Sequence, residues 1–387
     1  MKHTVPAILA IAALTPGLNA LDVKDDDVKL GLTLQLQLRA DVSEAEDAAG
    51  NDYDVMTGGA NGGDAVDFYN RRMRFGLKGT YKGDYRFSVV FYGDKAQTNS
   101  QTIRLYESTI TRVWNDEANG LSHEFKAGLS NAFYNGALGS YASASFLFAG
   151  SRASDGFGGS RGYGAGYLLT SKFGRFGADV QNNISDDSGT TGTPAVVTQS
   201  DGMFYSARVE ISPPGELNIA KPAETFLGKE GKGVLLAADY MSNVRAANAT
   251  TSTGYGIELL GHFDAITALA EYRTLSSENH STDLTVDGEV WLVQAGYAMP
   301  LAGAVIEPAI RYQVIDKNTD EDNEGTSYGT SLDYGNSGTQ IDLGVNYYIH
   351  GNNNKVQLSY TMWEGEEVEG GDAATADILR AQWQLWF

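Results

Sequence analysis

Residues 29–41 read KLGLTLQLQLRAD, and their side chains alternate strictly between two kinds. Every second position from Leu30 to Leu38 is a leucine, whereas the positions between them hold glycine, threonine and glutamine. Successive side chains of a β-strand point to opposite faces, so this period of two predicts a strand with one apolar and one polar face. A single strand of this kind fits a soluble β-sandwich as well as a barrel.

The same pattern recurs as far as the last residue of the chain. We expect sixteen strands, at 29–41, 72–78, 85–92, 102–114, 123–130, 162–172, 175–183, 202–212, 233–243, 254–263, 265–274, 289–299, 304–314, 339–349, 355–363 and 377–387. Two of them alternate poorly, because Glu107 falls on the face of Ile103 and Leu105, and residues 233–238 lack polar side chains. Repeated strands with one apolar and one polar face predict an all-β fold, a transmembrane antiparallel β-barrel with a wet interior.

The connections between these strands alternate in length. Long connections are expected at 42–65, 131–161, 185–201, 276–288, 316–338 and 364–376, and short ones at 82–83, 173–174, 264, 300–303 and 351–354. Long outer loops and short periplasmic turns are typical of outer-membrane barrels. The link at 213–232 is an exception, because it is long where a short turn is expected, and we interpret it as a periplasmic excursion.

The first twenty residues have the composition of an export signal. Lys2 precedes an apolar run from Val5 to Leu14, and Ala20 is a small residue at the expected cleavage site. This pattern predicts a cleaved signal peptide at 1–20 and a mature chain that starts at Leu21. We expect residues 21–387 to form a single outer-membrane β-barrel domain, because no linker or break in composition divides them.

The composition excludes several classes of protein. The chain has 46 Gly, 21 Tyr, 15 Phe, 8 Pro and no Cys, so it is not a disulfide-stabilised secreted domain. Its formal net charge is −21, and removal of Lys2 with the signal peptide makes this −22, which opposes binding to nucleic acid. No histidine pair has the spacing of metal ligands, so we expect no metal site and no cofactor. The enzymatic alternative is a barrel hydrolase that uses a serine with His123.

Several segments carry a resemblance to a known family. The closing strand 378–387, ILRAQWQLWF, looks like the terminal recognition signal of outer-membrane barrels. The segments 70–94 (NRRMRFGLKGTYKGDYRFSVVFYGD), 204–213 (FYSARVEISP), 293–300 (VQAGYAMP) and 342–361 (DLGVNYYIHGNNNKVQLSYT) resemble the phosphate-selective porin O and P family. This resemblance implies a trimer of sixteen-stranded barrels, each with a third long loop folded into its pore. Here that candidate pore-constricting loop is 131–161.

Basic residues of the early strands and of this loop are the candidates for the pore lining. They are Arg72, Arg74, Lys78, Arg86, Arg104, Arg112, Lys126, Arg152 and Arg161. A row of arginines that stay charged can pass an anion along a pore. The same arginines can instead pair with carboxylates such as Glu124 and hold the barrel and its loop in place. The sequence leaves both roles open.

The long loops are acidic, which argues against a specific phosphate pathway. We expect an acidic mouth, with Asp320, Glu321, Asp322, Glu324, Glu366 and Glu367 as its candidate residues. A negative mouth disfavours the entry of anions over about 8 to 10 Å at moderate ionic strength. The oxygen ligands at 320–324 also suit divalent cations, but they lack the spacing of an EF-hand loop.

These observations predict a porin in the outer membrane of a Gram-negative-type envelope. Its function would be passive diffusion of small hydrophilic solutes or inorganic ions through a water-filled channel, without an enzymatic step. Its partners would be outer-membrane lipid and two further copies of the chain in a homotrimer. The alternatives are an anion-selective porin of the phosphate type, and a structural or adhesive barrel whose acidic loops bind cations.

Overall fold

The computed structural model describes a large part of the chain. The described residues are 22–24, 27–46, 53–54, 59–60, 65–93, 103–134, 146–150, 152–156, 161–182, 202–213, 222–245, 250–316, 337–365 and 374–387. The predicted signal peptide at 1–20 and the six acidic-mouth residues lie outside these ranges. No helix among the described residues is long and apolar enough to cross a bilayer.

Sixteen of the described strands form one closed antiparallel barrel, as predicted. They are β2 (Val28–Glu46), β5 (Ala65–Tyr81), β6 (Tyr85–Tyr92), β7 (Arg104–Asp116), β8 (Leu121–Asn131), β9 (Arg161–Ser171), β10 (Gly174–Asn182), β11 (Gly202–Ile211), β12 (Lys232–Arg245), β13 (Thr250–Phe263), β14 (Ile266–Asn279), β15 (Leu284–Tyr297), β17 (Ala304–Asp316), β18 (Gly338–Tyr348), β19 (Asn354–Gly365) and β20 (Thr375–Trp386). Each strand pairs with the next one in this order, and β20 pairs with β2, which closes the ring.

Four short strands and one short helix complete the described structure. Strand β1 (Asp22–Lys24) pairs with the start of β2, and β16 (Met299–Leu301) pairs with the start of β17. Strands β3 (Tyr53–Asp54) and β4 (Gly59–Ala60) pair with each other, and η3 (Ala153–Gly156) is a single 3₁₀ turn.

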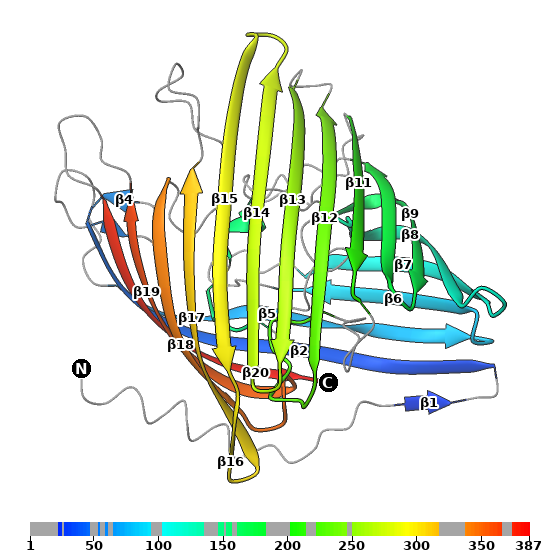
Figure 1. Cartoon of the computed structure of the whole chain (residues 1–387), viewed down its shortest axis with the longest axis horizontal. Coiled ribbons are helices and arrows are strands. Elements are labelled where there is room, and N and C mark those ends of the chain that lie inside the picture. The colour runs from blue at the N-terminus through cyan, green and yellow to red at the C-terminus, as the bar shows by residue number, and fades with distance from the viewer. Residues whose placement is uncertain are drawn as a thin grey trace.

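The strands are steeply tilted with respect to one another across the barrel. In Figure 1, β12 to β15 run nearly upright in the front wall, whereas β2, β5 and β6 run nearly sideways behind them. Closing a twisted sheet on itself requires such a tilt. Strand β16 and the hairpin that it begins project below the barrel, at the end where the short turns lie.

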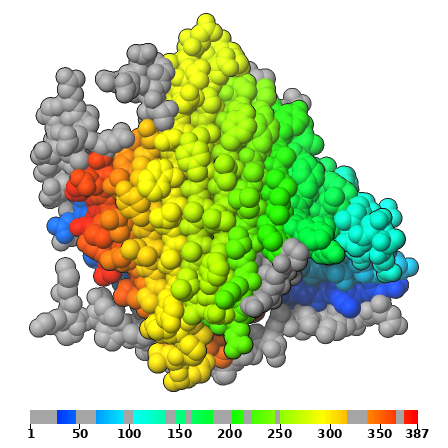
Figure 2. Space-filling view, viewed as in Figure 1, coloured from blue at the N-terminus to red at the C-terminus, as the bar shows by residue number. Residues whose placement is uncertain are grey.

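Along each strand, apolar side chains face outward and most polar ones face inward. On β18, Leu343 and Val345 are exposed on the outer surface, whereas Asp342 and Asn346 are buried inside. Figure 2 shows that the outer surface over β12 to β17 is continuous. The exposed outer side chains include Ile257, Val293 and Ile310. A soluble protein rarely exposes so much contiguous apolar surface.

Most of the predicted connections agree with the described strand ends, with one correction. Lys82 and Gly83 both have positive φ, 51° and 78°, as in the two-residue turns that match the twist of a hairpin. The long connection predicted at 276–288 is wrong, because β14 continues to Asn279 and β15 begins at Leu284. The tip of the hairpin at 276–283 (SSENHSTD) has no apolar side chain, so its sequence lacks the alternation that would identify a strand.

Two β-bulges shift the alternation within single strands. On β5, the bulge residue is Arg71. Its neighbours Arg72 and Asn70 pair with Gln37 and Leu38, which are successive residues of β2. On β7, the bulge residue is Tyr106, because its neighbours Leu105 and Glu107 pair with successive residues of β6. A bulge inserts one residue and reverses which positions face inward beyond it. The bulge at Tyr106 therefore explains why Glu107 appeared to share a face with Leu105.

The carboxyl end of the chain closes the barrel. The backbone N–H of Leu34 donates to the carbonyl of Phe387 at 2.7 Å, and the N–H of Phe387 donates to the carbonyl of Leu34 at 3.0 Å. These two bonds extend the seam between β2 and β20 to the last residue of the chain.

Removal of Phe387 should weaken this seam. Each lost backbone bond contributes about 1 kcal/mol net, so truncation at Trp386 should lower the free energy of unfolding by about 2 kcal/mol. The measurement is denaturant unfolding of the refolded protein, followed by tryptophan fluorescence. Phe387→Ala is the matched control, since it keeps both main-chain bonds and should lose less. Equal losses for the two variants would contradict the role of the main chain.

Candidate functional site

The described part of the predicted pore-constricting loop lies inside the barrel. We call residues 132–134, 146–150 and 152–156 the loop segment. The Phe146 carbonyl accepts hydrogen bonds from Lys355 Nζ at 2.7 Å and Gln357 Nε2 at 3.0 Å, both on the inner face of β19. The backbone N–H of Ala153 donates to Gln313 Oε1 on β17 at 2.7 Å. The loop segment therefore contacts the inner wall directly.

A second insertion enters from the opposite end of the barrel. The unexpectedly long connection between β11 and β12 includes the described residues 222–231, which we call the link segment. Its Glu224 and Thr225 are only 1% and 2% exposed. Thr225 Oγ1 donates to Glu307 Oε1 on β17 at 3.0 Å, so this segment also contacts the inner wall.

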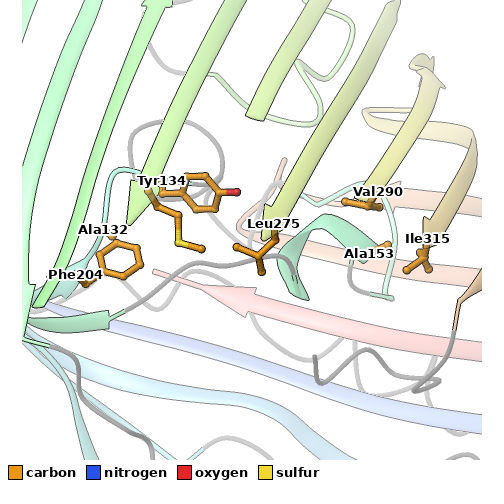
Figure 3. Packing of buried hydrophobic residues seen from close by; sticks show 8 residues of the cluster. Ala132, Tyr134, Ala153, Phe204, Leu275, Val290 and Ile315 are labelled. Carbon is orange, nitrogen blue, oxygen red and sulfur yellow. The ribbon is translucent and has the colours of Figure 1, made fainter. Parts of the chain in front are cut away.

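Apolar clusters hold both insertions against the inner wall. Near the short-turn end, five inward residues of β12 to β15 are packed by Phe146 of the loop segment and Phe226 of the link segment; they are Leu235, Ala237, Leu260, Leu269 and Leu292. Figure 3 shows the second cluster, where Tyr134 and Ala153 of the loop segment meet Phe204, Leu275, Val290 and Ile315. The sequence predicted a wet interior, and this prediction is wrong for the wall of β12 to β15.

The buried charges of the same side are paired. Arg273 Nη1 is 2.7 Å from Asp239 Oδ1, and Arg273 also pairs with Glu271. Arg208 Nη1 is 2.5 Å from Asp239 Oδ2, and farther round the barrel Arg311 Nε is 2.7 Å from Asp342 Oδ2. A buried charge is tolerated only when it is paired and hydrogen-bonded, so these contacts fix the inward side chains. Burial also raises the pKa of the Tyr134 phenol in the loop segment to about 12.

The wall formed by β2 and β5 to β8 borders a cavity instead. The cavity holds about 540 Å³, and its lining includes four cations, Lys29, Lys78, Arg86 and Lys126, and one carboxylate, Glu107. The other lining residues are uncharged. The lining is thus strongly basic, although the net charge of the chain is −21.

Most of the predicted lining residues lie inside the barrel. Lys78, Arg86 and Lys126 line the cavity, and Arg86 pairs with Glu124 at 3.0 Å. Arg72 donates to Gln37 Oε1 at 2.9 Å, with its guanidinium 5.6 Å from the centre of the Phe146 ring. Arg104 pairs in register with Tyr92, which belongs to the inner face of β6.

A bulge residue that the sequence did not single out organises two of these arginines. The guanidinium carbons of Arg74 and Arg161 lie 4.0 and 3.5 Å from the centre of the Tyr106 ring. Arg74 Nη1 also donates to the Tyr106 hydroxyl at 2.8 Å. The bulge turns this ring toward the interior, where it holds both cations by cation–π contact.

Two predicted lining residues need correction. Arg112 faces outward, because it pairs with Tyr85 and Phe125 of the outer surface and lies 5.8 Å from the Trp114 ring. Strict alternation along the sequence would place Arg104 and Arg112 on the same face. The extra residue at Tyr106 shifts this alternation, so the two arginines face opposite sides of the sheet. Arg152 lies inside but is 3% exposed, between Glu224 at 3.5 Å and Glu271 at 3.3 Å. It therefore holds the loop segment to the wall.

Two features of the sequence were weak signals for the inward residues that its analysis missed. Residues 233–238 lack polar side chains because Leu235 and Ala237 face an apolar cluster inside the barrel while Val234 and Leu236 face outward. The second signal was the unexpected length of the connection at 213–232, which contains Glu224. His123 stacks on Trp114 and has Nδ1 2.6 Å from the Tyr167 hydroxyl. Among the described residues, no group of three or more His, Asp or Glu side chains could hold a metal ion.

Comparisons with solved structures agree on the fold. The outer membrane channel DcaP of Acinetobacter baumannii superposes with a TM-score of 0.53 at 14% identity, covering 94% of this chain and 99% of that one. The anion-selective porin of Comamonas acidovorans superposes with a TM-score of 0.54 at 13% identity, and the match covers 93% of this chain and 100% of that one. The chain has the fold of outer-membrane porins. OprB of Pseudomonas putida superposes with a TM-score of 0.54 at 10% identity, and the match covers 92% of this chain and 94% of that one.

Sequence comparisons do not assign a family. No family model matches the chain. An uncharacterized protein of Aquifex aeolicus (strain VF5) is 27% identical over 218 residues, which are 53% of this chain and 48% of that protein. The match therefore spans about half the length of this curated relative.

The buried and exposed ion pairs should differ in their effect on stability. Arg273→Met removes one of the two cations that pair with each of the buried carboxylates Asp239 and Glu271, and should cost about 3 kcal/mol. Arg86→Met breaks the half-exposed pair with Glu124 and should cost no more than about 1 kcal/mol. Denaturant unfolding of both variants measures the difference. A similar cost at both sites would show that the interior around Arg273 is solvated.

Proposed function

We propose that this protein is an outer-membrane porin that lets small hydrophilic solutes or ions diffuse passively. One observation carries the proposal: a closed barrel with an apolar outer face has a cavity on its inner wall that is lined mostly by polar and charged residues. The apolar face suits lipid, because the pairing of β2 with β20 leaves no open edge between the first and last strands of the ring. The cavity suits water and hydrated solutes, since most of its lining side chains are polar or charged.

Several further assignments belong to this proposal. Export by a cleaved signal peptide would deliver the chain to the outer membrane, with the short turns on the periplasmic side. The loop segment would constrict the pore, and three copies of the chain would form a trimer. Membership of the phosphate-selective porin O and P family is supported by the quoted segments and by the porin fold.

Single-channel recording tests the proposed function. The purified protein, reconstituted in a planar lipid bilayer, should produce discrete conductance steps in KCl, grouped in threes if the unit is a trimer. A correctly folded barrel that gives no conductance would contradict the porin and would favour the structural or adhesive alternative. Heat-modifiable migration on a detergent gel establishes that the barrel is folded.

A second candidate function, a preference for anions, is favoured by the charge of the cavity lining. Four cations face the cavity against one carboxylate, so the local potential attracts anions. Lys29 and Lys78 make no ion pair with any carboxylate of the described residues. Arg72 and Arg74 continue the basic wall toward the loop segment, where Arg72 lies over Phe146. An acidic mouth at 320–324 and 366–367 would oppose this preference at low ionic strength.

Removal of the cavity charges should change the ion selectivity. Lys29→Gln combined with Lys78→Gln should shift the reversal potential in asymmetric KCl toward cations, and Arg72→Gln with Arg74→Gln should do the same. The shift should be largest at low ionic strength, where screening is weakest. Arg112→Gln is the matched control, because it removes a positive charge from the outer face and should leave the potential unchanged. An unchanged potential in both double variants would contradict a role of these four residues in ion selectivity.

A further inference from the structure

The link segment has an unusual position for a connection between neighbouring strands. Residues 222–231 form the last part of the connection between β11 and β12, whereas the other connections at this end of the barrel are short turns. Instead of crossing the rim, the link segment carries Glu224 and Thr225 into the interior, where both are almost fully buried. A buried carboxylate is costly unless it is paired, so the partners of Glu224 indicate what the segment does.

The partners of Glu224 belong to the loop segment that enters from the other end. Its Oε2 accepts a hydrogen bond from the backbone N–H of Leu147 at 3.0 Å. Its Oε1 lies 3.5 Å from Arg152 Nε, and Arg152 in turn pairs with Glu271 on β14. The side chain of Glu224 therefore contacts the loop segment at two points, five residues apart, and Arg152 connects it to the wall.

The link segment is anchored to the wall by other contacts. The Phe226 ring lies 4.6 Å from the ring of His262, and His262 Nε2 is 2.7 Å from the carbonyl oxygen of Lys229. At its end, Gly231 and Asp264 exchange two hydrogen bonds of 2.9 Å. These contacts do not involve Glu224. The carboxylate can therefore be removed while the segment stays in place.

We propose that the link segment is a second constricting element of the pore, and that Glu224 is the positioning residue that holds the loop segment against the wall of β12 to β15. The two segments close that side of the barrel from opposite ends. The solute path then runs along the wall of β5 to β8 and the start of β2, past the basic cavity. This inference rests on the proposed porin function for its effect on transport, but the contact between the two segments does not depend on it.

Conductance of Glu224 variants provides the first test. Glu224→Ala removes both contacts to the loop segment and should raise the single-channel conductance by roughly 1.5-fold or more, with larger fluctuations, because a wider aqueous opening conducts more. Glu224→Gln keeps an acceptor for the N–H of Leu147 and should show a smaller rise. Glu230→Ala is the matched control, since Glu230 is exposed on the same segment. It should behave as the unmodified protein does.

Thiol labelling provides a second test that does not require conductance. The chain has no cysteine, so Ala149→Cys places a single thiol in the buried loop segment. A maleimide should label this thiol slowly in the otherwise unmodified protein. Adding Glu224→Ala should accelerate the labelling at least about tenfold, which corresponds to a loss of about 1.4 kcal/mol in the docking of the loop segment. Adding Glu230→Ala should leave the labelling rate unchanged.

The two measurements separate the possible failures. If the unmodified protein does not conduct but Glu224→Ala accelerates labelling, the porin function fails while the positioning role stands. If the unmodified protein conducts and Glu224→Ala changes neither conductance nor labelling, the positioning role is overturned and the porin function stands. If labelling accelerates equally in Glu224→Ala and Glu230→Ala, the link segment has been generally disturbed, and the specific role of Glu224 is rejected.

Discussion

Closure of the sheet is the constraint on which the rest of the structure depends. When β20 pairs with β2, the first and last strands of the ring are joined, and the backbone groups along their edges find partners within the sheet. The outer face is apolar, as the exposed Leu343 and Ile257 show. Such a face can lie against a nonpolar environment only if the backbone beside it is paired. Closure also creates the interior in which charged side chains need partners.

The interior is divided into two unlike halves by what enters it. On the side of β11 to β15, the loop segment and the link segment cover apolar side chains, and the arginines lie within hydrogen-bonding distance of carboxylates. On the side of β2 and β5 to β8, the lysines border open space. In the proposed porin, the residues that border this open space govern transport, and the buried inward-facing residues set the shape of the passage.

The sequence predicted the sixteen strands and their order because lipid-facing and inward-facing residues alternate with a period of two. It failed where a different physical rule applied. The polar tip of the β14–β15 hairpin resembled a loop, and a bulge at Tyr106 placed Arg112 on the wrong face. Holding the loop in place was one of the two roles left open for Arg152, but its pairing with Glu224 was out of reach, because it joins segments about seventy residues apart. The acidic-mouth residues lie outside the described part of the chain.

The bulge at Tyr106 also has an evolutionary consequence. In a regular strand of period two, the loss of one residue exchanges the two faces from that point to the next turn. A bulge is the exception, because its extra residue has no partner in the ladder. If Tyr106 were deleted, its neighbours would keep their partners on β6, so Thr109 and Thr111 would stay inside and Trp114 outside. The bulge is therefore the place where β7 can change its length without exchanging its faces, and selection on Tyr106 should act through the two cations that its ring contacts.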